Sequence, residues 1–120
     1  MSNARITVFT PAYNRAHTLP RTYESLKNQK NKNFIWLIVD DGSKDNTKEL
    51  VDSWLKEDFG FKIKYIYKEN GGMHTAHNVA YEFIGTELNV CIDSDDCLAE
   101  DAINKILNKW DEVKIKDMQV

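Results

Sequence analysis

The chain has 120 residues, of which 42% are hydrophobic and 29% charged, and its formal net charge is -3. This length allows one modest domain with a buried core, and the lack of a basic excess argues against nucleic acid or an anionic membrane as the main partner. No apolar run reaches the roughly 18 residues of a membrane-spanning helix and no signal peptide opens the chain, so we expect a cytoplasmic protein.

The first strand and helix are predicted within the first 33 residues. Residues 1–4 are interpreted as the remnant of an expression tag. Residues 5–10 are a short β-branched and aromatic run that predicts a strand, which Pro11 is expected to end because it cannot donate a backbone hydrogen bond. Apolar residues at intervals of four and three between 19 and 26 predict a helix, which ends before the polar residues 31–33.

The second strand is the most apolar stretch of the chain. Residues 34–39 are six apolar residues without alternation, which is typical of a strand buried on both faces of a parallel sheet. The strand leads into Asp40-Asp41-Gly42-Ser43. A helix with its apolar stripe in residues 50–55 follows, and Ser43 or Asp45 is expected to cap it.

Two further strand and helix units are predicted after this point. Residues 61–67 indicate a third strand near a sheet edge, and residues 74–84 a helix with Gly85 as its C-cap. Residues 88–92 predict the fourth strand and 98–110 the last helix. The polar tail from 111 to 120 is expected to fray.

Four successive strand and helix units predict an α/β protein with a Rossmann-like, three-layer architecture. Right-handed crossovers would place helices on both faces of a mainly parallel sheet. In such sheets, ligands bind beyond the carboxyl ends of the strands. We therefore expect the loops at 10–15, 40–43 and 93–96 to converge on one crevice.

The loop after the fourth strand holds three carboxylates, Asp93, Asp95 and Asp96. Like charges this close repel one another, and oxygen ligands with open positions favour a hard cation such as Mg²⁺ or Mn²⁺. A solvated turn that caps the last helix near Leu98 is the alternative. An EF-hand is excluded because Leu98 stands at the position that requires glycine.

Three motifs in the chain resemble the N-terminal half of a glycosyltransferase family 2 enzyme with the GT-A fold. They are Thr10-Pro11-Ala12-Tyr13-Asn14-Arg15, Val39-Asp40-Asp41-Gly42-Ser43 with Asp45 and Thr47, and Asp93-Ser94-Asp95-Asp96. Each is weak alone, but they occur in the family's order and at family-like separations. The resemblance implies inverting transfer of a sugar from a nucleotide-diphosphate sugar, with UDP as the expected nucleotide and Mg²⁺ or Mn²⁺ as the cofactor.

The resemblance also implies roles for single residues. The implied nucleotide-binding residues are Thr10, Pro11, Ala12, Tyr13, Asn14, Asp41, Asp93 and Asp95, and the implied metal ligands are Asp95 and Asp96. Pro11 and Tyr13 would lie against the uracil and ribose, and Asp41 would accept a hydrogen bond from the base. Asp40 would be structural and orient its loop.

Other polar residues are weaker candidates. The backbone of Asn70-Gly71-Gly72 can approach phosphate closely, although a plain turn fits as well. His74 and His77 share a helix face, but no third ligand nearby supports a zinc site. His77 stands where relatives carry arginine, and Lys68 and Arg15 are candidate substitutes for that charge at the phosphates.

In the family that the chain resembles, the catalytic base and the acceptor-binding half lie downstream of the acidic motif. We therefore expect residues 1–120 to form one donor-binding part, truncated at its C-terminus, with an unpaired edge beside the fourth strand that favours self-association. Neither donor sugar nor acceptor is readable. A catalytically silent nucleotide-binding or assembly module is the main alternative, and a receiver-like phosphoacceptor domain ranks low because no acidic pair follows the first strand.

Overall fold

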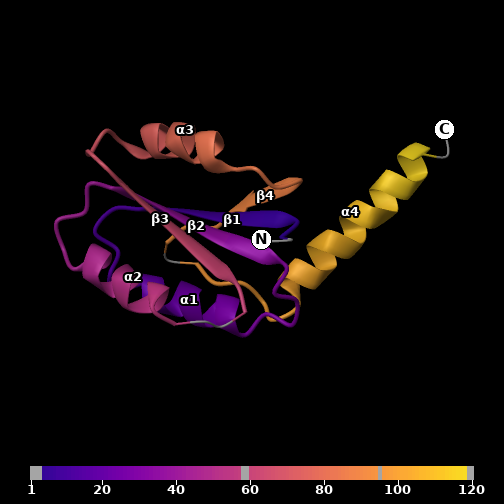
Figure 1. The fold of residues 1–120 in the computed structure, drawn as a ribbon, viewed down its shortest axis with the longest axis horizontal. Coiled ribbons are helices and arrows are strands. Elements are labelled where there is room, and N and C mark those ends of the chain that lie inside the picture. The colour runs from indigo at the N-terminus through magenta and orange to yellow at the C-terminus, as the bar shows by residue number, and fades with distance from the viewer. Residues whose placement is uncertain (1–3, 58–59, 95, 119–120) are drawn as a thin grey trace.

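The computed structural model describes residues 4–57, 60–94 and 96–118, with side chains up to residue 113. Strands and helices alternate along the chain (Figure 1). The elements are β1 Ile6–Ala12, α1 Leu19–Lys27, β2 Phe34–Asp41, α2 Thr47–Leu55, β3 Lys62–Lys68, α3 Met73–Phe83, β4 Leu88–Cys91 and α4 Ala102–Met118. The strands form one sheet in the order β3-β2-β1-β4, and each neighbouring pair is parallel. The predicted α/β, Rossmann-like architecture is confirmed, including the edge position of β3.

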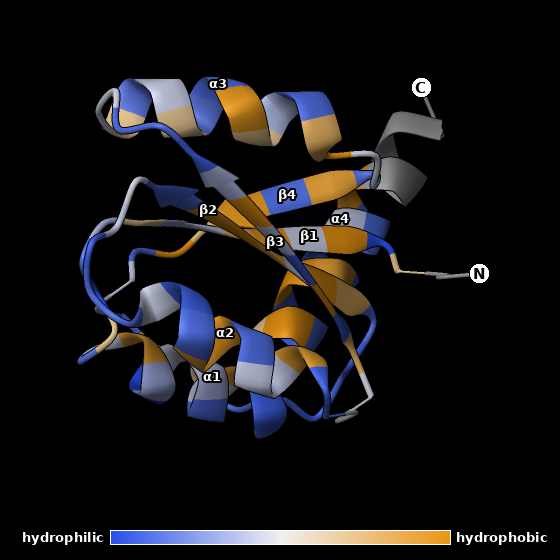
Figure 2. Cartoon of the chain, turned by 60° about the vertical axis from the view of Figure 1, so that its left-hand side comes forward, coloured by the Kyte–Doolittle hydropathy of each residue, from blue (hydrophilic) through white to orange (hydrophobic). Residues whose placement is uncertain are grey.

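The sheet is covered by helices on both faces, with α3 on one side and α1 and α2 on the other (Figure 1). Alternate residues of β1 point to opposite faces, so that Val8 packs toward α1 and α2 while Phe9 packs toward α3. Hydrophobic residues concentrate between these layers (Figure 2). The larger cluster includes stacked rings of Tyr23, Trp36 and Trp54. Burial of both faces explains why β2 reads as a continuous apolar run.

β1 does not end at Pro11, as the sequence predicts, but continues to Ala12 with Pro11 opposite Val39 of β2. The reason lies in the short neighbour on the other side. The Phe9 carbonyl accepts from Ile92 N–H (2.9 Å), so that Phe9 and, two residues on, Pro11 direct their backbone groups toward β4. β4 has already ended at Cys91, so no strand residue stands beside Pro11 on that side. The missing N–H of Pro11 therefore breaks no hydrogen bond of the sheet.

Three helix boundaries also differ from the prediction. α2 begins after Asn46, although Asp45 does accept a hydrogen bond from Thr47 N–H (3.0 Å). The C-cap of α3 is Ile84 in an extended conformation, so Gly85 does not supply the left-handed cap. The last helix begins at Ala102 rather than at Leu98, which rules out its capping by the acidic turn at that position.

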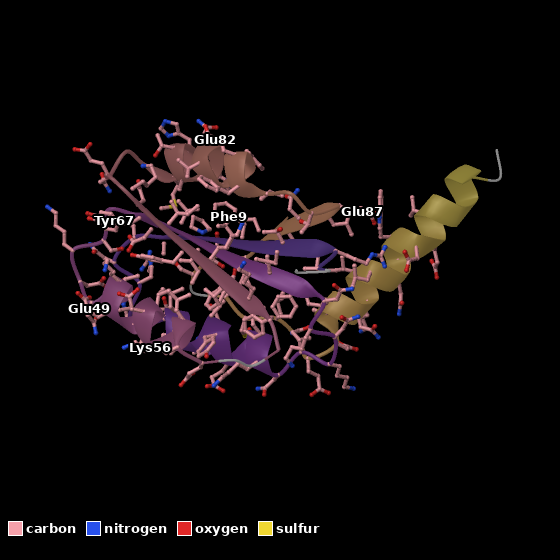
Figure 3. The ribbon with its side chains drawn as sticks, in the orientation of Figure 1. Phe9, Glu49, Lys56, Tyr67, Glu82 and Glu87 are labelled. Carbon is pink, nitrogen blue, oxygen red and sulfur yellow. The ribbon has the colours of Figure 1, made fainter. Side chains whose placement is uncertain are left out.

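The segment from residue 111 to Met118 is helical, whereas the sequence predicts a frayed tail from 111 to 120. Asp111 at its start is tied to the body of the domain, because Arg5 donates to Asp111 Oδ1 (2.7 Å) and to Glu87 Oε1 (3.1 Å). The Trp110 indole also donates to Glu87, which lies beside α4 (Figure 3). Beyond this anchor α4 projects away from the sheet (Figure 1). Within the described residues, no helix is long and apolar enough to cross a membrane.

Candidate functional site

The predicted site residues lie where β1, β2 and β4 end. β1 lies between the other two strands, and all three run in the same direction. The loops that follow them therefore leave the sheet at the same end, where the carboxyl ends of the strands lie. These loops comprise residues 13–18, 42–46 and 92–101. The arrangement follows from parallel topology, which gathers strand ends that are far apart in the sequence.

The first two loops are joined by side chains. Asn14 N–H donates to Ser43 Oγ (2.8 Å), and Asn14 Oδ1 accepts from Lys44 N–H (2.7 Å). Asn14 holds a left-handed backbone conformation with φ of 53°, which asparagine tolerates better than most residues. Asp45 completes the junction by accepting from Ala16 N–H (3.2 Å).

Asp40 has the structural role that the sequence predicts. It is fully buried, and its Oδ1 accepts from Ser43 N–H (2.8 Å) while its Oδ2 accepts from the Tyr65 hydroxyl (2.5 Å). Burial, and then the hydrogen bond to Asp40, raise the pKa of Tyr65 far above its usual range, so this phenol stays a donor. Asp40 thereby fixes the turn that presents Ser43 to Asn14.

Asp41 is also buried, with 1% of its surface exposed, and both of its oxygens are engaged. Oδ1 accepts from Lys68 Nζ (2.6 Å) and Gly71 N–H (3.0 Å), and Oδ2 accepts from Gly72 N–H (2.9 Å). Desolvation alone would raise the pKa of Asp41, but these hydrogen bonds and the ammonium charge outweigh it and hold the pKa below the usual value. The carboxylate therefore clamps the loop between β3 and α3.

Lys68, a candidate phosphate contact, is turned inward by this clamp. Its ammonium also donates to the Glu69 carbonyl (2.6 Å) and to Thr75 Oγ1 (2.8 Å), so all three of its donors are used. His77 packs edge-on against Phe9 with 5.0 Å between ring centroids. Figure 3 shows Phe9 between β1 and α3. His77 is thus a packing residue of this interface.

Some of the predicted nucleotide-binding residues are buried, and others are exposed to solvent. Thr10 is fully buried and its hydroxyl accepts from the Trp36 indole (2.9 Å), and Pro11 and Ala12 are buried within β1. The side chains that solvent reaches are those of Tyr13, Asn14 and Asp93, with Tyr13 38% exposed. Asp95 lies outside the described residues.

The acidic turn leaves β4 with Asp93 and Asp96 exposed and Ser94 buried between them. Asp96 N–H donates to the Asp93 carbonyl (3.0 Å), which closes the turn. Carboxylate oxygens of this kind fit Mg²⁺ or Mn²⁺ and suit soft cations poorly. Among the described residues, which leave out Asp95, no three His, Cys, Asp or Glu side chains lie close enough to hold a metal ion.

The residues that hold the acidic turn in place are not among those predicted from the sequence. Thr22 of α1 and Gln29, two residues past the end of this helix, are buried polar residues, at 0% and 2% exposure, and they bond the backbone of Asp96 and Ala99. Their spacing of seven residues corresponds to one helix face, but these partners lie 74 and 70 residues away in the sequence. The sequence pattern indicates that Thr22 and Gln29 share a helix face, but it does not indicate that they bond the segment after β4.

A parallel α/β domain with a polar loop at one strand end and an acidic turn at another has the architecture in which ligands bind beyond the carboxyl ends of the strands. The family model described as glycosyl transferase family 2 matches residues 7–115. The chain therefore belongs to glycosyltransferase family 2, and the resemblance noted in its motifs is confirmed.

Relatives share the fold as well as the sequence. The chain is 36% identical over 107 residues to the teichoic acid poly(glycerol phosphate) polymerase of Staphylococcus epidermidis, covering 88% of this chain and 15% of that protein. Its fold resembles S. aureus TarS 1–349 in complex with UDP, with a TM-score of 0.81, 26% identity, and coverage of 90% of this chain and 32% of that one. It also resembles the mannosyltransferase PcManGT of Pyrobaculum calidifontis in complex with GDP-Man and Mn²⁺, with a TM-score of 0.77, 25% identity, and coverage of 82% and 30%. The chain thus spans about a third or less of these proteins.

Proposed function

We propose that residues 1–120 form the donor-binding part of an inverting, metal-assisted glycosyltransferase, whose donor is a nucleotide-diphosphate sugar. The observation that carries this proposal is the gathering of the three family motifs at the carboxyl edge of β1, β2 and β4. Family membership supports the reaction class, and the TarS and PcManGT complexes support the ligand class because their titles name UDP, GDP-Man and Mn²⁺.

In this proposal the base and ribose occupy the surface next to Tyr13, whose exposed ring offers a face for stacking. Asn14 and Ser43 hold that loop in place through their mutual hydrogen bond. The base reaches Asp41 only after the Lys68 ammonium moves away, since the carboxylate is otherwise covered. Thr10, Pro11 and Ala12 support the loop from within the sheet.

Asp96, together with Asp95, would hold Mg²⁺ or Mn²⁺, and Asp93 would bond near the donor sugar. The cation, when bound, would neutralise charge on the diphosphate that leaves. We assign no residue of this chain to the proton transfer from the acceptor hydroxyl, and we propose that the base and the acceptor site lie elsewhere in the full protein. Transfer by the 120 residues alone is therefore not expected.

Calorimetric titration with UDP tests this proposal. We expect UDP to bind in the presence of Mn²⁺ and to bind at least about tenfold more weakly with EDTA, because a cation held by Asp95 and Asp96 would neutralise the charge of the diphosphate. Asp96→Ala should abolish the Mn²⁺ dependence. Asp52→Ala, which removes a carboxylate on α2 that forms an ion pair with Lys48 of the same helix, is the control and should bind as the wild type.

A GDP titration under the same conditions separates the two nucleotides. We expect UDP to bind more tightly, in line with the nucleotide inferred from the motifs. Tighter binding of GDP would keep the reaction class and change the donor. If neither nucleotide binds, the proposed donor binding is contradicted, and only the assembly form of the catalytically silent module remains.

The outer edge of β4 supports a proposal on self-association. β4 is the last strand in the sheet order. A largely apolar groove between β4 and α4 is lined by Leu88, Lys105, Ile106, Lys109, Trp110 and Val113. We propose that this edge pairs with a second copy of the 120-residue chain. Sedimentation equilibrium should show a dimer that Trp110→Glu converts to monomer, and a monomeric wild type would contradict the pairing. A cytoplasmic location stays a prediction.

A further inference from the structure

The face of α1 that meets the chain after β4 carries polar side chains. We call Thr22, Ser25 and Gln29 the α1 polar stripe. They stand at intervals of three and four residues, which places them on one side of the helix and of the turn that follows it. Thr22 and Gln29 are buried, and a buried polar group that lacked a partner would be strongly unfavourable. Their partners therefore indicate their purpose.

Each member of the stripe bonds the backbone of the segment between β4 and α4. Thr22 Oγ1 donates to the Asp96 carbonyl (2.5 Å), and Ser25 Oγ accepts from Leu98 N–H (3.1 Å). Gln29 binds at two points, since its Nε2 donates to the Ala99 carbonyl (2.6 Å) and its Oε1 accepts from Ile103 N–H (3.1 Å).

These bonds replace regular secondary structure. Among the described residues of the segment 92–101, which leave out Asp95, none lies in a strand or a helix, and the bond from Ile92 N–H to the Phe9 carbonyl is the last sheet bond before the acidic turn. α1 is itself fixed, because Leu19, Tyr23 and Leu26 are buried in the main core. The α1 polar stripe thus links the backbone of Asp96 by hydrogen bonds to a helix that is packed in the core.

The same helix is also bonded to the first loop. The Arg15 carbonyl accepts from Thr18 N–H (3.0 Å) and Leu19 N–H (2.9 Å), so α1 begins directly on the loop that carries Tyr13 and Asn14. One helix therefore sets both the base side and the acidic side of the site. In the proposed function, this arrangement would fix the separation between the surface for the base and the surface for the diphosphate.

We propose that the α1 polar stripe is a positioning device that sets the acidic turn at the correct place to hold the metal and diphosphate. Thr22 is the positioning residue nearest to the ligands, because it bonds the backbone of Asp96 itself. This inference rests on the proposed function of the chain. It adds residues that touch neither nucleotide nor metal and act through Asp96.

The test measures UDP affinity with Mn²⁺ and with EDTA for Thr22→Val and Thr22→Ser. Valine keeps the volume and removes the donor, so we expect UDP·Mn²⁺ to bind about tenfold more weakly, as for other partners that orient metal ligands. Binding in EDTA should not change, and serine, which keeps the hydroxyl, should restore the wild-type value. Ser53→Ala is the control because its hydroxyl bonds only within α2, to the Leu50 carbonyl.

A second variant gives a readout that needs no ligand. Ser25→Ala removes the acceptor of Leu98 N–H and leaves the core in place, so amide exchange at Leu98 should accelerate about tenfold while that of Phe9 in β1 stays constant. The same variant should weaken UDP·Mn²⁺ binding severalfold.

The outcomes separate the two proposals. Wild-type protein that shows no Mn²⁺-dependent binding of UDP or GDP would contradict the proposed function. Wild-type protein that binds, combined with Thr22→Val and Ser25→Ala variants that fold and bind equally well, would overturn the positioning role alone. A loss of binding in Thr22→Val that is equal with Mn²⁺ and with EDTA would also overturn it, since it would point to general damage.

Discussion

Two adjacent aspartates at the end of β2 differ in what they hold. Asp40 bonds the turn that follows it and the Tyr65 hydroxyl of the neighbouring strand, whereas Asp41 bonds a loop from another part of the chain. A buried carboxylate is stable only when hydrogen bonds and a countercharge replace its water shell. Asp41 has both, through Lys68 and the amides of Gly71 and Gly72.

Replacement of Asp41 by asparagine should destabilise the domain by about 2–3 kcal/mol, because the Lys68 ammonium then loses its countercharge and an amide cannot replace all the bonds. The pKa of Asp41 is lowered in the folded state, so its stabilisation is complete above the ordinary carboxyl pKa of about 3.9 and is lost as the pH falls through the folded value. Urea unfolding at pH 7 and at decreasing acidic pH measures both effects.

The control for this variant is Asp52→Asn, whose partner Lys48 is exposed, and which should change the unfolding free energy by less than about 0.5 kcal/mol. The difference between Asp41→Asn and wild type should shrink as the pH falls below the ordinary carboxyl range. A difference that stays constant with pH would show that the carboxylate charge contributes nothing.

At the scale of loops and helices, Gly42 is the residue on which the clamp depends. Its φ is +77°, and a Cβ placed there would lie 2.7 Å from Asn70 N and 2.9 Å from Asn70 Cβ. The close approach lets Asn70 donate to the Asp41 carbonyl (2.9 Å). The predicted turn at 40–43 thus requires glycine for two separate reasons, its dihedral angle and its lack of a side chain.

Gly42→Ala should therefore lower the unfolding free energy by at least about 2 kcal/mol, which combines left-handed strain with displacement of the loop at Asn70. Gly85→Ala is the matched control, since its added Cβ meets no atom within 4 Å and its φ is not positive. That control should be neutral or slightly stabilising. Equal urea midpoints for the two variants would contradict the role of Gly42.

The strands were predictable because their signals are local, and the last helix was less so because its limits depend on distant partners. The apolar run of β2 reflects burial on both faces, which the sequence itself records. In contrast, residues 98–101 read as helical, but Leu98, Ala99 and Glu100 bond instead to Ser25 of α1 and to Gln29 and Lys30 just after it. Likewise, helix continues past Trp110, where the next residue, Asp111, pairs with Arg5 at the other end of the chain.

For the whole molecule, the order β3-β2-β1-β4 explains why the motifs meet. Placing β1 at the centre brings its loop between those of β2 and β4, although the motifs are about 30 and 50 residues apart in the chain. Topology of this kind follows from the alternation of strands and helices, and so the meeting of the loops was predictable.

The internal bonding of the site was not predictable in the same way. Residue types indicate that a carboxylate or hydroxyl can bind a ligand, but Thr10 and Asp41 are engaged by Trp36 and Lys68 from neighbouring strands. Such pairings depend on the register of the sheet and on side-chain direction, which single residues do not encode. The roles inferred for Tyr13, Asn14, Asp93, Asp95 and Asp96 stay predictions.

The central claim is that loops from three strands form one site for a nucleotide and a divalent cation. The most direct measurement is paramagnetic broadening of backbone amide signals by Mn²⁺ in the presence of UDP, with Mg²⁺ and UDP as the diamagnetic reference. We predict the strongest broadening at Tyr13, Ser43 and Asp96, and the weakest at Phe34 and Leu88 at the opposite ends of their strands. Broadening centred at that opposite edge, or confined to the acidic turn with no effect at Tyr13 and Ser43, would contradict the claim.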